Sequence, residues 1–454
     1  MRRLPFPIPT PDWNTSARVI TYPGALCCLL WPVPELILAA GLLLFALEMW
    51  CFLRQSDRSI DLRVLLRIIS LVFMWIAPAL SYVFADAGWY TGYRMAVPAG
   101  LYFALAIPCT VAFNLALTVP TGAARTFPDI DSRAWGWSLL AVGVLTQQVV
   151  PHVEIPAGLR HPLYLTGQLW LVGLLFLQQA YPTRRWWLFG AAVAYLLLDA
   201  LHTTLFGYMM VWAALLLCYT LRPGEVRFRY RLSAALLLAM AALFVLSFKY
   251  EYRQKIWHEQ ATEPRWQIFL SLAGQRLTHP ADLWRPDIIQ HYTDRLNQGY
   301  HTAMCMAYVP ANEPFARGAT LLDDVRSALL PRFLAPGKQR AGGAENIRRF
   351  SGVSGQRWSS NIGHYGEAYV NFGTGGAWLV MLLYGLFIGA AWWGMRRFFP
   401  LPWWPFVLQP VLNVEEDIGM GLNHIVKAVL FAVLVAAIAG LWKRARLTRL
   451  ITDN

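Results

Sequence analysis

The chain has 454 residues, of which 57% are hydrophobic and 14% are charged, and its formal net charge is +13. A soluble domain carries about 25% charged residues, and this much apolar sequence excludes an ordinary soluble protein. The basic residues form short clusters between apolar runs, which is a topology signal, so no nucleic-acid partner is inferred. The six Cys show no metal-site or disulfide spacing, and no metal and no cofactor are predicted.

Apolar runs recur along the chain, and a helix needs about 20 mainly apolar residues to cross a bilayer. We therefore predict an all-α polytopic membrane protein with about 11–12 transmembrane helices. The stretch 19–32 is either a short twelfth crossing or a re-entrant piece, and both interpretations stay open. The eleven other runs lie near 34–53, 62–84, 95–119, 135–151, 162–181, 186–201, 205–221, 232–248, 371–395, 401–414 and 424–442.

The connections between the runs alternate between basic and non-basic. Under the positive-inside rule the basic set is cytoplasmic, and it includes the tail after residue 442. The basic connections lie near 54–63, 122–133, 182–185, 222–231 and 395–397. This alternation predicts three regions: an N-terminal bundle of about eight spans (1–248), a large outer loop (249–368), and about three C-terminal spans with a cytoplasmic tail (369–454).

The segment 249–368 has no spanning run and is predicted to be a small, mostly helical cap. A loop of this length is usually functional or a domain of its own. Helical spacing of apolar residues occurs at 266–277, 280–296 and 321–334. We expect this cap to pack on the outer ends of the spans.

Arg is far more frequent than Lys in this loop, and Arg binds phosphate oxygens through two parallel hydrogen bonds. Any single Arg is most simply a partner for the loop's carboxylates. The stretch LPRFLAPGKQRAGGAENIRRFSG (330–352) alternates Pro, Gly and basic residues and is not one regular element, so it suits an anion-binding loop. The candidate cations are Arg332, Lys338, Arg340, Arg348, Arg349 and Arg357.

The stretch GEAYVNFGTGG (366–376) opens an apolar run. Glu367 is placed about one turn outside a span that begins near Val370, and a carboxylate at a membrane boundary is a functional candidate by default. Glu367 is interpreted as a general base, as a group that orients a sugar hydroxyl, or as a partner of a loop Arg, and His364 is the alternative base. The competing interpretation is a helix N-terminal carboxylate favoured by the helix dipole. Tyr369 and Asn371 are candidate hydrogen-bond partners for a sugar or for neighbouring helices.

Together these features resemble a known family. Many spans, one outer loop carrying LPRFLAPGK (330–338), and GEAYVNFGTGG leading into a span resemble the Wzy-type polymerases of bacterial O-antigen and exopolysaccharide repeat units. These polymerases belong to the O-antigen polymerase and ligase superfamily. The resemblance is specific over roughly residues 295–395 and only topological across the first eight spans.

The resemblance implies a GT-C-like, inverting, metal-independent glycosyltransferase at the periplasmic face of the bacterial inner membrane. Its substrates would be undecaprenyl-pyrophosphate-linked oligosaccharides. Its other partners would be the lipid bilayer, a flippase and a chain-length regulator.

The family's motifs map onto individual residues of this chain. The resemblance makes Glu367 or His364 the base, and Arg332 and Arg349 the cations that stabilise the leaving pyrophosphate. Many relatives carry a Ser-Arg pair near an outer span end, where this chain has HTTLFGYM (202–209); Arg94 is the candidate substitute. The substrate-binding set is Lys338, Arg340, Arg348, Arg357, Arg94, Asn371 and Tyr369.

Three other functions remain open. A ligase of the same superfamily would use the same residues on a different acceptor. A transporter would show discontinuous helices and midplane charges. The centres of the predicted spans are poor in charge, which argues against this function. A structural subunit would use the loop to bind a protein partner.

Overall fold

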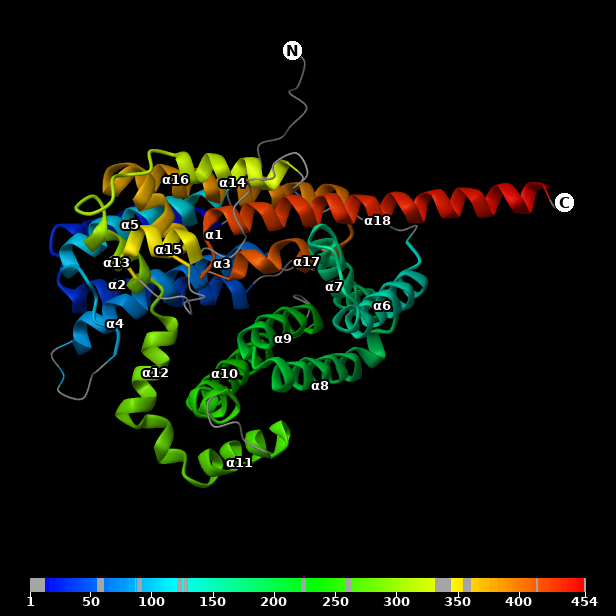
Figure 1. The fold of residues 1–454 in the computed structure, drawn as a ribbon, viewed down its shortest axis with the longest axis horizontal. Helices are drawn as coiled ribbons and strands as arrows, with labels where there is room; N and C mark the ends of the chain where they lie inside the picture. Colours follow the sequence, from blue (N-terminus) through cyan, green and yellow to red (C-terminus); the bar gives the residue numbers. More distant parts are fainter. Residues whose placement is uncertain are drawn as a thin grey trace, which may run out of the picture.

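The computed structural model describes residues 13–54, 61–85, 87, 92–120, 125, 127, 130–221, 226–257, 263–330, 344–353, 361–413 and 415–452. All regular elements in these ranges are helices (Figure 1). Seven of them are long and apolar enough to cross a bilayer, so the chain is an all-α multi-pass membrane protein. They are Pro34–Leu53 (α2), Leu62–Phe84 (α3, η2 and α4), Ala99–Ala116 (α5), Pro182–Thr203 (η4 and α8), Phe228–Trp257 (α10), Gly363–Phe398 (α16) and Ile418–Ile438 in α18 (Ile418–Thr452).

Three further predicted runs are helical but fall short of a spanning helix in length or apolarity. Two of these helices, α6 and α7, pack closely on each other. A Cβ added to Gly143 of α6 would lie 2.2 Å from the backbone nitrogen of Trp170 in α7, so the two backbones approach as small residues permit. The three helices are α6 (Ser132–Val149), α7 (Ala157–Ala180) and α9 (Phe206–Thr220).

The run predicted as a span over 401–414 is not one helix, which corrects that expectation. Pro402, Pro405 and Pro410 interrupt it, because Pro removes a backbone donor and clashes with the preceding turn. Most of its side chains are buried in protein, where irregular backbone is tolerated at membrane depth. It forms η6 (Leu401–Trp403), α17 (Trp404–Leu408) and η7 (Gln409–Leu412).

The N-terminal segment, α1 (Trp13–Gly24) and η1 (Ala25–Leu29), runs along α5 in the opposite direction. The Tyr22 hydroxyl accepts a hydrogen bond from Asn114 near the end of α5, and Pro32 lies beside Gly100 at its start. Those two α5 positions are roughly 21 Å apart at 1.5 Å per residue. The chain therefore follows α5 along its length and does not turn back as a re-entrant piece would.

Segment 249–368 is mostly helical where it is described, as predicted. The adjoining helices extend into it, since α10 continues to Trp257 and α16 begins at Gly363. Its described helices pack against the spans. Asn297 donates a 2.7 Å hydrogen bond to Ser81 in α4, and α14 lies along α18 (Figure 1). The elements are α11 (Arg265–Thr278), η5 (Pro280–Trp284), α12 (Pro286–Leu296), α13 (Gly299–Tyr308), α14 (Ala319–Leu329) and α15 (Ala344–Ser351).

Helix α16 folds back on itself at Gly373, where φ is 65° and ψ is −170°. The rings of His364 and Tyr384 lie 6.0 Å apart, although 20 residues of straight helix would separate them by roughly 30 Å. Residues 363–372 therefore form a short buried helix packed against the first half of the spanning part. The sequence predicted a span beginning near residue 371 and did not predict this hairpin.

Replacing Gly373 with Ala is expected to destabilise the protein by about 1–3 kcal/mol, because these dihedral angles are essentially restricted to Gly. The new Cβ would also meet the Phe315 ring at 3.3 Å. Gly375→Ala is the matched control, since its Cβ would meet nothing within 4 Å and Ala favours helix. Thermal unfolding of both purified variants in detergent measures the difference, and equal midpoints would argue against a Gly-dependent hairpin.

Candidate functional site

Glu367 is fully buried in the hairpin and does not stand outside a span as predicted. Its side chain is 0% exposed, and its Oε2 atom accepts a 2.8 Å hydrogen bond from the backbone nitrogen of Ile418 at the start of α18. The competing interpretation placed Glu367 at the N-terminus of its own helix. In the structure it accepts a hydrogen bond at the N-terminus of a different helix, α18. This contact ties the short helix of the hairpin to the C-terminal span.

Two more carboxyl groups lie beside Glu367. Asp324 of α14 interacts with Glu367 and contacts α18 at Gly419, and Asp417 accepts a 2.8 Å hydrogen bond from the Met420 nitrogen. We call Glu367, Asp324 and Asp417 the carboxyl cluster. Burial raises the pKa of Asp324 to about 6, and the Asp417 charge adds to this shift.

The raised pKa of Asp324 predicts that stability falls as pH rises. An unfolded Asp titrates near pH 3.9, so the folded state holds this proton more tightly. The stabilisation is fully present below about pH 4 and is lost as pH rises through about 6, an effect of about 3 kcal/mol at most. Asp324→Asn should flatten this dependence in thermal unfolding between pH 4 and 7. The exposed variant Asp287→Asn, whose charge is not among those acting on Asp324, should keep it, and an unchanged slope in Asp324→Asn would contradict the assignment.

Asn371 and Tyr369, predicted to hydrogen-bond either a sugar or neighbouring helices, have their polar atoms engaged with neighbouring segments of the protein. The Asn371 side chain accepts from the Gly318 nitrogen at 2.9 Å and donates to Thr320 Oγ1 at 2.7 Å and to the Glu367 carbonyl at 2.8 Å. The Tyr369 hydroxyl donates to the Val309 carbonyl at 2.9 Å. Both side chains therefore position the turn before α14 and the end of α13 against the hairpin.

His364, the alternative base, is 6% exposed and packs among aromatic rings. Its ring lies 5.1 Å from Tyr365 and 6.0 Å from both Phe113 and Tyr384, measured between centroids. It lies in the same buried hairpin as Glu367, so the structure brings the two predicted bases together. Neither side chain lines the apolar pocket between α2, α3, α9 and α10.

The predicted cations are not gathered at one described point. Arg349 donates a 2.6 Å hydrogen bond to Glu313 and is half exposed, whereas Arg348 and Arg94 are exposed. Four of the predicted cations lie outside the described residues: Arg332, Lys338, Arg340 and Arg357.

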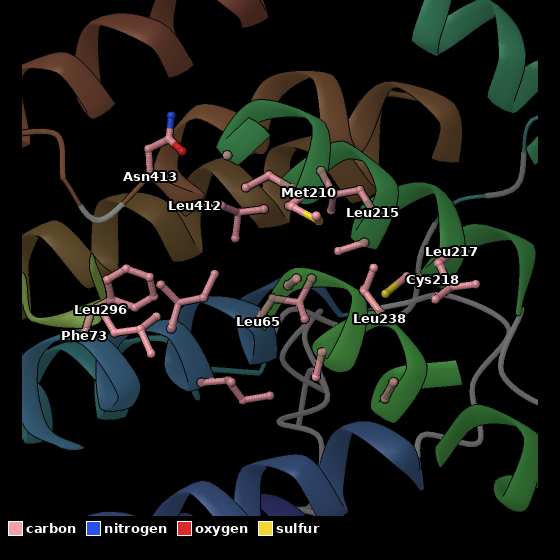
Figure 2. Close-up of a pocket in the computed structure, with 18 of the residues that line it drawn as sticks. Leu65, Phe73, Met210, Leu215, Leu217, Cys218, Leu238, Leu296, Leu412 and Asn413 are labelled. Atoms are coloured by element: carbon pink, nitrogen blue, oxygen red, sulfur yellow. The ribbon is translucent and has the colours of Figure 1, made fainter. Parts of the chain in front are cut away.

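A large apolar pocket of about 470 Å³ lies between α2, α3, α9 and α10 (Figure 2). Aliphatic and aromatic side chains such as Leu65, Phe73, Met210 and Leu238 line it. Only 22% of the most apolar part of α10 is buried in protein, so the helix that forms one wall presents most of its surface to lipid. The pocket is therefore suited to a hydrocarbon chain that continues into the bilayer.

Charged residues line this pocket in two places: Arg231 near the start of α10, and a group of charges near Lys249. Lys249, Arg295 and Glu415 line it there, and Arg253 interacts electrostatically with Lys249. Arg295 forms an ion pair with Glu415. We call these four residues the pocket mouth; three cations and one carboxylate leave a formal excess of two positive charges.

Lys249 is the unusual member of the mouth. Its side chain is 8% exposed, and it makes no hydrogen bond or ion pair within the described part of the chain. Arg253 donates to the Thr204 carbonyl at 3.0 Å, while its buried Nε has no partner there. A buried ammonium without a partner is costly, and an anionic ligand at the mouth would remove that cost.

Sequence reasoning did not single out the mouth. Lys249 and Arg253 fell within the segment predicted as the outer loop. The structure gives each acid of the run 415–417 different surroundings: Glu415 pairs with Arg295, Glu416 accepts from Asn413, and Asp417 accepts at the start of α18. The sequence did offer one signal. Three consecutive acids (415–417) and Lys249 lie near the ends of predicted spans, where each charged side chain needs a partner.

The fold and this site define an all-α multi-pass membrane protein with an apolar pocket whose polar end is cationic. Comparisons with protein-family models, with curated proteins and with solved structures find no match for the chain. Its function has therefore to be inferred from the contacts of its own residues.

Proposed function

We propose that the protein is a glycosyltransferase that joins undecaprenyl-pyrophosphate-linked oligosaccharide repeat units into O-antigen or exopolysaccharide. The proposal places this GT-C-like enzyme in the bacterial inner membrane, with segment 249–368 and the reaction at the periplasmic face. The observation that supports it most is the apolar pocket ending at the unpaired, buried Lys249. A long hydrocarbon tail with a multiply charged anionic head matches both parts of this site.

The mouth suits a departing pyrophosphate. In an inverting transfer, an acceptor hydroxyl oxygen bonds to the anomeric carbon of the donor while the bond from that carbon to the pyrophosphate oxygen breaks. Negative charge then builds on the leaving group, and fixed cations in a site with little water stabilise it strongly. Lys249, Arg253 and Arg295 are assigned this role.

The residues predicted from the sequence take different places in this proposal. Glu367 and Asn371 hold the hairpin and α14 in position and do not contact substrate. Arg94, Arg348 and Arg349 are assigned to the saccharide, which extends away from the mouth. The same role remains a prediction for Arg332, Lys338, Arg340 and Arg357, which lie outside the described residues.

The glycan size profile of a deletion strain tests the proposed activity. Loss of the gene should collapse a long glycan ladder to single repeat units, and the wild-type gene should restore it. Full-length polymer left on the lipid carrier would instead identify the ligase alternative. An unchanged ladder would contradict both.

One observation favours the transporter alternative. Glu48 and Arg67 are buried within candidate spans, with 0% and 1% exposure, although each lies nearer an end of its span than its centre. Two apolar segments are also discontinuous, as in many transporters: α16 is interrupted at Gly373, and segment 401–412 is divided into three short helices. Uptake or release of lipid-linked repeat units by vesicles containing the purified protein, without change in glycan length, would support this alternative.

A further inference from the structure

Glu416 and His424 face each other beside the pocket mouth. Glu416 Oε2 and His424 Nδ1 lie 3.6 Å apart, and neither atom has a hydrogen-bond partner in the described part of the chain. The gap is too long for a direct hydrogen bond. Two buried polar atoms in this arrangement can be satisfied together by a hydroxyl that donates to the carboxylate and accepts from the ring.

A short path connects this pair to the mouth. Asn413 lines the apolar pocket and donates a 3.3 Å hydrogen bond to Oε1 of Glu416. The adjacent residue, Glu415, is the carboxylate paired with Arg295. Glu416 is partly exposed, with 17% of its side chain accessible, whereas Glu367 is 0% exposed. Of the two carboxylates, only Glu416 is near the mouth and has a partly exposed side chain, although its Oε2 atom is itself buried.

The surroundings of Glu416 also suit proton transfer. Burial raises the pKa of Glu416 to about 7; the Asp417 and Glu415 charges add to the shift, and the Asn413 hydrogen bond opposes it. A general base works best with a pKa near the working pH. The titratable groups that face the pair are His161 and Tyr164 of α7, His364 and Tyr384 of α16, Lys427 of α18, and the neighbours Glu415 and Asp417.

We propose that Glu416 is the catalytic base, and that the gap between Glu416 and His424 binds the acceptor sugar hydroxyl. This inference rests on the proposed function and names a different base from the two predicted from the sequence. The acceptor O–H bond breaks as its oxygen bonds to the donor's anomeric carbon. The proton goes to Glu416, and the electron pair of the broken anomeric bond leaves with the lipid pyrophosphate at the mouth.

The test uses the full-length protein in lipid nanodiscs, with lipid-linked repeat units extracted from the deletion strain as donor and acceptor. Glu416→Gln should lower kcat by about 10²–10⁴-fold, the usual contribution of a positioned base, with little change in KM. Glu416→Asp should retain part of the activity. The exposed carboxylate variant Asp323→Asn is the matched control and should behave as wild type.

The pH profile separates catalysis from structure. Because Glu416 must be deprotonated to accept the proton, wild-type kcat should rise with pH and level off above about pH 7. The residual kcat of Glu416→Gln should not rise with pH in this way. Its thermal unfolding midpoint should equal that of the wild type. An active Glu416→Gln enzyme with the wild-type profile would overturn this inference alone, whereas a wild-type protein that makes no polymer would overturn the proposed function with it.

Discussion

Replacing Lys249 with Met is expected to stabilise the protein and to abolish polymer formation. Lys249 is 8% exposed and has no hydrogen-bond or ion-pair partner in the described part of the chain. Apolar side chains of similar size often stabilise a protein by about 1–4 kcal/mol when they replace buried ionic groups. The same change would remove a cation from the leaving group, and losses of about 10²–10³-fold in kcat follow removal of one such stabilising group.

The opposite signs of the two effects make this prediction sharp. If the role of Lys249 were purely structural, its substitution would lower the stability and the activity of the protein together. Thermal unfolding and glycan length are measured for Lys249→Met and for Lys255→Met, a partly exposed Lys on the same helix that does not line the pocket. A Lys249→Met protein with normal polymer would remove the mouth from the mechanism.

Replacing Glu48 with Ala is expected to destabilise the protein by about 3–5 kcal/mol, because it leaves two buried cations without their carboxylate. Arg18 donates to Glu48 at 2.8 and 2.9 Å, and Arg67 donates to it at 3.2 Å. The Tyr22 hydroxyl adds a fourth contact at 3.1 Å. These hydrogen bonds connect the N-terminal segment to α2 and α3, so α1 should detach from these helices when they are lost.

A combined variant distinguishes the cause of that loss. Glu48→Leu together with Arg18→Met and Arg67→Met removes all three charges and should recover most of the stability lost in Glu48→Ala. Glu35→Ala, an exposed position on the same helix, is the control. Thermal unfolding in detergent measures all four proteins, and a triple variant as unstable as Glu48→Ala would show that charge burial is not the cause.

Composition and apolar periodicity were enough to predict the membrane class and the helical character of segment 249–368. The helices at 266–277 and 321–334 appear as α11 and α14, since each has apolar residues at helical spacing. Run length is a local property, so it predicted the observed bounds of α2 and located α10, although α10 continues nine residues beyond the predicted end at 248. It could not distinguish the broken segment 401–412 from a helix, because that segment is as apolar as the spans around it.

The site depends on contacts between residues far apart in the chain, which a single sequence does not reveal. Glu367 was placed at a membrane boundary because the hairpin at Gly373 was not foreseen; a single Gly in a Gly-rich stretch does not specify its dihedral angles. The mouth joins Lys249, Arg295 and Glu415 from three separate elements. Only the packing of α9, α10, α12 and the segment before α18 brings them together.

The most direct test of the central claim is to locate a bound polyprenyl pyrophosphate by photo-crosslinking. The purified full-length protein is irradiated with a polyprenyl pyrophosphate that carries a photoreactive group in the tail, and the labelled peptides are mapped. We expect labels on α9 and α10, displaced by unlabelled polyprenyl pyrophosphate but not by the uncharged polyprenol, and strongly reduced in Lys249→Met. Labels spread over other lipid-facing helices, or equal labelling of Lys249→Met, would contradict the assignment of this pocket.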